Sequence, residues 1–300
     1  MGRKIISTIN FQSKKEGIIQ EFQICSCKKI LKLSSSEVVV CKYEYPLKIM
    51  IPSSASETLC QWLYPITFGG GLVEGDSITI NLIVSEKCCL LVTSLSFPKV
   101  YRCENNIESQ QFLKCDVEAD ALLCVLPDPL VCYEKALYLQ TQTFHLADDA
   151  NLVLLDWFTS GRYERGERWQ FSRLKTVSTI YINGQLSFRE AQDIRNTPLV
   201  SIESSMKAYN IIGTCMIIGP GLNSLSSCIL SSIGRCNSYG EKSCKNILIS
   251  ASPLCLNETS KPCGCIVRFA SESVSDAIKK IEEILQPLYE IIGDNPFIKK

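Results

Sequence analysis

The sequence predicts a mainly β protein built from stacked sheets or a β-coil. From residue 77 to about residue 182, short apolar or alternating runs recur roughly every 10 to 15 residues between turn residues, which is typical of many β-strands. No long amphipathic helix separates these runs, which argues against a doubly wound fold of alternating strands and helices. A chain of 300 residues, 46% of them hydrophobic, is long and apolar enough to bury a substantial core.

The expected strands follow one another closely. In the first, residues 77–85, every second side chain is aliphatic, and a turn at Glu86-Lys87 leads to the next run at 88–94. Such alternation is what a strand with one buried face requires. The later runs, each bounded by turn residues, are 110–118, 121–127, 135–146 and 151–158.

Two helices are expected later in the chain. A short one spans residues 223–233 and is weakened by its serines. A stronger one spans 275–292, begins at a serine, carries an apolar face and stops at Gly293. We expect Pro287 to kink it and its apolar face to pack on a sheet, with a partner-binding face as the alternative. The polar stretch 236–245 is expected to form a loop.

Charge and cysteine usage narrow the classes of partner and compartment. The 31 basic and 31 acidic side chains cancel, so no whole-molecule field gathers nucleic acid or an anionic membrane. The N-terminal residues lack the apolar core of a secretory signal, and no run of 18 apolar residues occurs. We therefore expect a cytoplasmic protein with neither partner, whose 17 cysteines stay reduced and mostly act as small hydrophobic side chains.

A single histidine, His145, removes several catalytic and metal-binding mechanisms. It rules out a His-rich zinc or nickel site, and no Gly-x-Ser-x-Gly motif is present for a serine hydrolase. The glycine-rich segment 68–76 lacks the Lys-Ser/Thr of a phosphate-binding loop and leads into a strand. Two alternatives stay open, an enzyme with paired carboxylates and a thiol-based metal or redox sensor. The sensor would use the cysteine pairs Cys25 and Cys27, Cys88 and Cys89, and Cys263 and Cys265.

Four polar clusters interrupt the apolar pattern. Each lies at an expected strand end or turn and is dense in glycine, proline or charge. Arginines in such clusters can form forked pairs with carboxylates, so structural ion pairs are one interpretation. The clusters are Gly70-Gly71-Leu72-Val73-Glu74-Gly75-Asp76, Lys99-Val100-Tyr101-Arg102, Leu126-Pro127-Asp128-Pro129 and Gly161-Arg162-Tyr163-Glu164-Arg165-Gly166-Glu167.

In this order the clusters resemble the urease accessory protein family of the D type, called H in some species. The match is strongest over residues 65–195, whereas residues 196–300 agree mainly in length and order. We therefore expect one domain over residues 1–300. The segment Ser94-Leu95-Ser96-Phe97-Pro98 departs from the family's small-residue stretch and is bulkier.

The resemblance implies a β-helix-like stack of sheets with few helices, including a C-terminal one. It implies a non-enzymatic scaffold, a metallochaperone that binds apo-urease, the F-type accessory protein and the G-type GTPase. Nickel in transit would pass through an internal route to the nascent urease active site, with no tightly bound cofactor. A homodimer within the complex stays open.

Single carboxylates suit such a route, because their oxygens replace part of the hydration shell of the ion without trapping it as a His/Cys cage would. The acids expected to line it are Asp76, Asp156, Glu167 and, after a turn at Asn183-Gly184, Glu190. Cations on the route would repel nickel, so the residues expected to hold the carboxylates in place are Lys99, Arg162 and Arg165. For each acid, a structural ion pair is the alternative.

Overall fold

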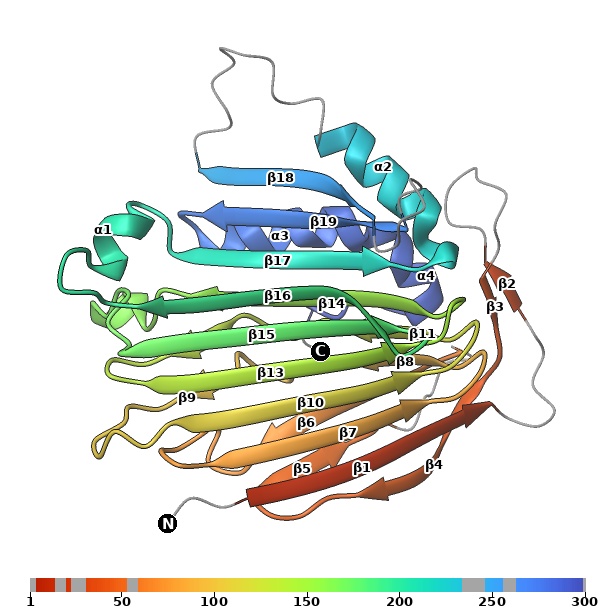
Figure 1. Ribbon diagram of the computed structural model, residues 1–300, viewed down its shortest axis with the longest axis horizontal. Helices are drawn as coiled ribbons and strands as arrows, with labels where there is room; N and C mark the ends of the chain where they lie inside the picture. The colour runs from red at the N-terminus through yellow and green to blue at the C-terminus, as the bar shows by residue number, and fades with distance from the viewer. Residues whose placement is uncertain are drawn as a thin grey trace.

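The computed structural model describes residues 4–13, 20–22, 31–52, 59–233, 246–255 and 263–298. Two large β-sheets face each other, and helices lie on the far side of the second sheet (Figure 1). The mainly β, stacked-sheet fold expected from the sequence is thereby confirmed.

The first sheet has seven strands, and its central strands run parallel. In spatial order the strands are β16 (Gln185–Arg195), β15 (Arg173–Ile182), β13 (Leu137–Leu146), β10 (Ser109–Val117), β7 (Ser77–Val84), β1 (Lys4–Ser13) and β4 (Ser36–Lys42).

The second sheet has ten strands; much of it lies behind the first in Figure 1, and the rest extends past the upper edge of the first sheet. Its main path is β18 (Ile247–Leu254), β19 (Gly264–Ser271), β17 (Ile211–Ile218), β14 (Asn151–Thr159), β11 (Leu122–Val125), β8 (Cys89–Val92), β6 (Cys60–Thr67) and β5 (Leu47–Met50). The short strands β9 (Lys99–Val100) and β12 (Leu130–Cys132) join beside β14, and β2 (Gln20–Phe22) pairs with β3 (Leu31–Leu33) separately.

The central part of the chain winds as a coil between the two sheets. From β7 it crosses to β8, returns to β10, crosses to β11, returns to β13 and crosses to β14. Each return places a new strand parallel to the previous one, because the chain re-enters the same sheet in the same direction. The crossings at one end are short turns, and the returns at the other end are the long connections 93–108, 126–136 and 160–172.

The larger helices cover the outer face of the ten-stranded sheet (Figure 1). Helix α2 (Asn223–Ile233) has the bounds that the sequence predicts. The expected helix at 275–292 is divided into α3 (Val274–Leu285), the 3₁₀ turn η3 (Gln286–Leu288) and α4 (Tyr289–Ile292). The division falls at Pro287, which confirms the kink, and the apolar face packs on the sheet. The smaller helices are η1 (Tyr163–Arg165), α1 (Ile202–Met206) and η2 (Pro220–Leu222).

The two ends of the helical segment from α3 to α4 show why it starts and stops where it does. The Ser273 side chain accepts a hydrogen bond from the Asp276 backbone N–H at 3.3 Å, which satisfies a free donor of the first turn. Gly293, in the left-handed conformation, ends α4. Within the described residues, no helix is both long and apolar enough to cross a bilayer. The expected loop 236–245 lies outside those residues.

Two buried layers result from this arrangement. The inter-sheet layer lies between the two sheets and includes Ile78, Ile80, Leu113, Phe144, Leu154 and Phe158. The helix-side layer lies between the ten-stranded sheet and the helices and includes Val153, Leu155, Trp157, Cys215, Ile281 and Leu285.

Candidate functional site

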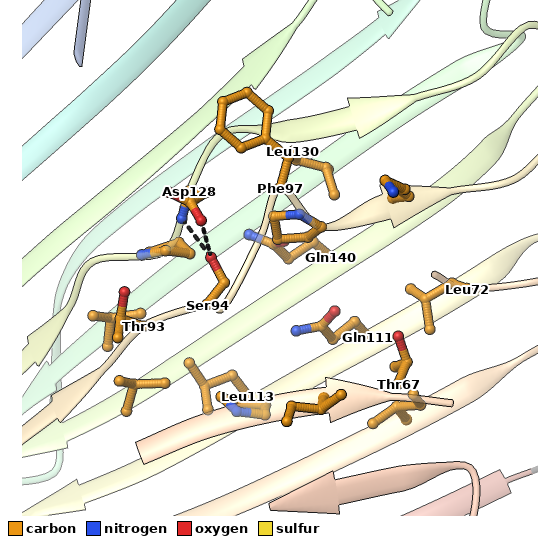
Figure 2. A pocket seen from close by; sticks show the side chains of 18 of the residues that line it. Thr67, Leu72, Thr93, Ser94, Phe97, Gln111, Leu113, Asp128, Leu130 and Gln140 are labelled. Atoms are coloured by element: carbon orange, nitrogen blue, oxygen red, sulfur yellow. Dashed lines mark hydrogen bonds between the residues drawn. The ribbon is translucent and has the colours of Figure 1, made fainter. Parts of the chain in front are cut away.

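A cavity of about 190 Å³ lies in the inter-sheet layer near the end that carries the long connections (Figure 2). Because one water needs on the order of 15 Å³ of such space, the cavity has room for on the order of ten waters. Aliphatic side chains form much of its wall. Its polar lining consists of Thr67, Thr93, Ser94, Ser96, Lys99, Gln111, Asp128, Tyr138, Gln140, Gln142 and Asp156.

Glutamines from two neighbouring strands supply amide groups to the cavity wall. Gln111 on β10 lies directly opposite Gln140 on β13 in the parallel ladder, so both side chains point to the same face of the sheet. The Tyr138 hydroxyl lies 3.1 Å from Gln111 Oε1 and 3.1 Å from Gln140 Oε1. These contacts orient the amides toward the space between the sheets.

Asp156 on β14 faces this amide wall from the opposite sheet. Gln140 Nε2 donates a hydrogen bond to Asp156 Oδ1 at 3.1 Å. Burial raises the pKa of Asp156 to about 6, the negative charge of Glu190 adds to the rise, and hydrogen bonds from Gln140 and Thr176 oppose it. The carboxylate is therefore mostly ionised at pH 7 and presents a negative charge to a confined, partly hydrated space.

A strip of polar side chains continues from Asp156 across both sheets. In the ten-stranded sheet, Asp156 lies opposite Thr214, which lies opposite Arg268. In the seven-stranded sheet, Thr176 lies opposite Gln140 on the neighbouring strand. Ser178 lies opposite Gln142 on one side and opposite Glu190 on the other. We call this set the polar strip: Gln111, Gln140, Gln142, Asp156, Thr176, Ser178, Glu190, Thr214 and Arg268.

At the outer end of the cavity, two long connections are tied together by Ser94 and Asp128 (Figure 2). Ser94 Oγ donates to Asp128 Oδ2 at 3.0 Å, and the Asp128 backbone N–H donates to Ser94 Oγ at 2.7 Å. Trp157 Nε1 donates to the Pro127 carbonyl at 2.8 Å. The bulkier segment 94–98, the departure seen in the sequence, forms part of the cavity wall.

The glycine-rich cluster 70–76 shapes the same end of the molecule. A Cβ on Gly71 would lie 2.7 Å from the Lys99 carbonyl oxygen, so only glycine allows this approach. Asp76 closes the turn: its Oδ2 accepts from the Val73 backbone N–H at 3.0 Å. The Asp76 carboxylate is buried in this turn and does not line the cavity.

Glu167 is also outside the cavity lining. Arg162 holds it through two hydrogen bonds, from Nε to Oε2 at 2.8 Å and from Nη2 to Oε1. The pair lowers the pKa of Glu167, and the charge of Arg165 adds to this effect. The Arg162 guanidinium lies 4.0 Å from the centre of the Tyr133 ring. Arg162 thus holds Glu167 in place, and Arg165 acts on it through its charge, whereas Lys99 lies on the cavity lining.

Of the four acids expected on a nickel route, the structure therefore brings Asp156 and Glu190 to the polar strip and places Asp76 and Glu167 in a turn and an ion pair. Gln111, Gln140 and Gln142 were not among the residues expected from the sequence. Their signal was present, since all three interrupt the inward-facing apolar positions of β10 and β13.

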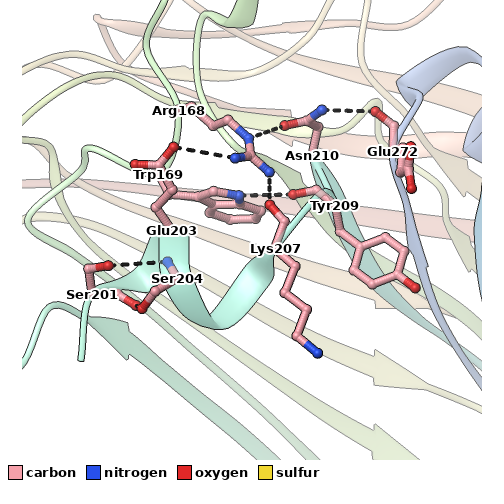
Figure 3. Close-up of polar contacts among 9 residues, drawn as sticks. All are labelled: Arg168, Trp169, Ser201, Glu203, Ser204, Lys207, Tyr209, Asn210 and Glu272. Atoms are coloured by element: carbon pink, nitrogen blue, oxygen red, sulfur yellow. Dashed lines mark hydrogen bonds and ion pairs between the residues drawn. The ribbon is translucent and has the colours of Figure 1, made fainter.

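The last third of the chain is anchored beside the fourth cluster (Figure 3). Arg168 Nε donates to Asn210 Oδ1 at 2.8 Å, and Asn210 Nδ2 donates to the Glu272 carbonyl at 2.9 Å. Trp169 Nε1 donates to the Tyr209 carbonyl at 2.9 Å. This network lies at the starts of β17 and α3 and so helps set the register of the strands that carry Thr214 and Arg268.

Most of the described cysteines are buried among apolar side chains, as packing residues are. Burial raises the thiol pKa of Cys60, Cys89, Cys124, Cys215 and Cys265, which disfavours the reactive thiolate. Across the part of the chain that the structure describes, no three His, Cys, Asp or Glu residues gather as metal ligands. The pair Cys25 and Cys27 lies outside that part.

Comparison with known proteins identifies the family. A family model described as UreD urease accessory protein matches residues 31–299. Urease accessory protein D of Arabidopsis thaliana is 32% identical over 279 residues, covering 87% of this chain and 95% of that protein. Urease accessory protein UreD of Sorangium cellulosum is 31% identical over 255 residues, covering 85% and 77%.

Urease accessory protein D of Oryza sativa subsp. indica is 39% identical over 189 residues, and this match spans only 62% of the length of the rice protein. These names are those of accessory proteins, in agreement with the expectation that the chain is not an enzyme. The chain belongs to the UreD family of urease accessory proteins.

Proposed function

We propose that the protein is a non-enzymatic accessory factor that binds apo-urease and helps pass nickel into its active site. Family membership supports the link to urease. The observation that carries the nickel part is the Asp156 carboxylate, which lies on the wall of a cavity between the sheets and begins a polar strip toward Glu190.

The chemistry of this strip suits an ion in transit. Amide and hydroxyl oxygens of Gln140, Gln142 and Thr176 can replace single waters of a hydrated cation, and one carboxylate supplies the attraction. A cage of several carboxylates, imidazoles or thiolates would bind Ni²⁺ too tightly to release it. The cavity is wide enough for Ni²⁺ to keep part of its hydration shell.

We further propose that partners dock around the cavity end of the molecule. Apolar side chains are exposed there, which favours a macromolecular contact: Tyr45, Phe68, Val73, Leu95 and Tyr163. From the family resemblance the partners would be apo-urease, the F-type accessory protein and the G-type GTPase, in the cytoplasm. The single domain over residues 1–300 and a homodimer within the complex stay predictions.

The test is co-expression of Asp156→Asn with urease and the other accessory proteins, followed by a nickel assay of purified urease. Asparagine keeps the size of the side chain and an acceptor for Gln140 Nε2 but removes the charge, so we expect nickel content to fall at least about threefold while urease is still captured. Asp116→Asn is the matched control, since Asp116 is exposed on β10. Normal nickel content in Asp156→Asn would exclude the proposed route.

A further inference from the structure

The polar strip ends at an ion pair at the edge of the two sheets. Glu190 lies on β16, the edge strand of the seven-stranded sheet, and Arg268 lies on β19, the second strand from the edge of the ten-stranded sheet. Arg268 Nη2 donates to Glu190 Oε1 at 3.3 Å. This contact joins two strands separated by 78 residues of sequence and bridges the two sheets.

The two partners face different environments. The Arg268 side chain is 52% exposed, whereas the Glu190 side chain is 15% exposed. The ten-stranded sheet continues past this point with β18, whose Leu248 and Ser250 are exposed because the seven-stranded sheet has ended at β16. Arg268 therefore lies at the solvent end of the polar strip, with Glu190 on its interior side.

Glu190 has unused capacity to bind a cation. Its Oε2 atom is buried and has no hydrogen-bond partner among the described residues. An ionised carboxylate offers about four acceptor positions, and a buried charged oxygen without a partner is unfavourable. A divalent cation beside Glu190 would satisfy this oxygen. The negative charge of Glu190 also acts on Asp156, so the two acids influence each other within the strip.

We propose that Arg268 is a gate residue that closes the far end of the polar strip to divalent cations by neutralising Glu190. This inference rests on the proposed nickel route and adds its regulation. While the pair is closed, the guanidinium occupies one carboxylate oxygen and its charge repels a second cation. One hydrogen bond to a half-exposed guanidinium is weak, so Arg268 swings into solvent readily and frees Glu190 as an oxygen ligand.

The experiment measures binding of Ni²⁺ alone to the purified full chain by equilibrium dialysis. Arg268→Gln removes the charge and keeps a polar side chain of similar length, and we expect it to bind Ni²⁺ about tenfold more tightly than the wild type. Arg268→Lys keeps the charge and should bind like the wild type. The double variant Arg268→Gln with Glu190→Gln should lose the gain, because the freed carboxylate is gone.

Arg189→Gln is the matched control. Arg189 is next to Glu190 in sequence but lines a shallow hollow on the outer face of the sheet, with Thr179 and Tyr181. Equal Ni²⁺ affinities of Arg268→Gln and Arg189→Gln would overturn the gate, as would tight binding that persists in the double variant. The outcome is separable from the proposed function: if Asp156→Asn lowers urease nickel content while these affinities are equal, the route stands and the gate fails. Tighter binding by Arg268→Gln with normal loading by Asp156→Asn would show that Arg268 controls Ni²⁺ binding at Glu190, although the polar strip is not the route to urease.

Discussion

The inter-sheet layer and the helix-side layer share strand β14 but bury different chemistry. Toward the seven-stranded sheet, β14 presents Asp156 to an amide wall. Toward the helices, it presents Val153, Leu155 and Trp157 to a layer of aliphatic side chains, aromatic rings and thiols. Adjacent positions on one strand therefore serve two purposes, because successive side chains of a strand point to opposite faces.

This difference indicates how the molecule can keep a hydrated interior and still stay folded. Close-packed apolar contacts on the helix side stabilise the ten-stranded sheet. The inter-sheet layer gives up some of that packing around the cavity, and its ionised carboxylate opposes folding. The packing of the helix-side layer thus holds in place the strands that carry the polar strip.

The largest expected effect tests that support. Leu155→Ala removes a fully packed side chain, 1% exposed, from the helix-side layer, and we expect a loss of about 2–4 kcal/mol in the free energy of unfolding. Urea denaturation followed by circular dichroism measures it. Leu186→Ala is the matched control, since Leu186 is 59% exposed and should change stability by less than about 0.5 kcal/mol. Equal losses in the two variants would show that the helix side is not the supporting layer.

The neighbouring residue should respond in the opposite sense. Because burial raises the pKa of Asp156 to about 6, the native state holds this proton more tightly than the unfolded chain, whose carboxyl titrates near 3.9. The contribution of Asp156 to stability therefore falls as pH rises from about 4 to about 6 and stays low above that window. Asp156→Asn has no buried charge at high pH, so we expect this variant to be about 2 kcal/mol more stable than the wild type at pH 8. This figure is smaller than the full pKa difference gives, because water in the cavity screens the charge.

Near pH 4 the Asp156→Asn variant and the wild type should have similar stability, because the carboxyl is protonated in the native state and about half protonated in the unfolded chain. The measurement is urea denaturation of both proteins at the two pH values. Asp116→Asn, which removes a charge from an exposed position of β10, should show no comparable gain at pH 8. A stability difference that does not change with pH would mean that Asp156 is not a buried charge.

The fold was predictable where the sequence pattern has one clear cause. Strand β7 alternates because one face is buried, and helix α2 is bounded by a glycine-rich turn and a polar stretch. No strand was expected before residue 77, although β6 and β1 lie there, and β17 and β19 were not expected either. An edge strand such as β16 carries polar side chains on both faces, and strands buried on both faces, such as β17, have no alternation to detect.

The site was predictable only in part, for a related reason. Asp156 interrupts an apolar run, and such an interruption is visible in sequence. Gln111 and Gln140 fall on the inward-facing register of β10 and β13, but one amide in an alternating strand does not show whether it lines a cavity or is packed. Asp76 was as conspicuous as Asp156 but closes a turn. The pairing of Glu190 with Arg268 arises from tertiary packing, which local sequence does not encode.

The smallest expected effect concerns the thiols of the helix-side layer. Cys215 on β17 is fully buried, and burial raises the pKa of its thiol, so it should neither bind nickel nor react in the folded protein. We expect Cys215→Ala to lower the free energy of unfolding by about 1 kcal/mol through lost packing and to leave the nickel content of co-expressed urease unchanged. Alkylation of the native protein with iodoacetamide, read by mass spectrometry, should modify the exposed Cys41, Cys228 and Cys255 and spare Cys215. A thiol that reacts or binds metal must reach solvent as the thiolate. Rapid alkylation of Cys215, or loss of urease nickel in Cys215→Ala, would therefore place the functional residues on the helix side instead of in the inter-sheet layer. Either result would favour the thiol-based sensor.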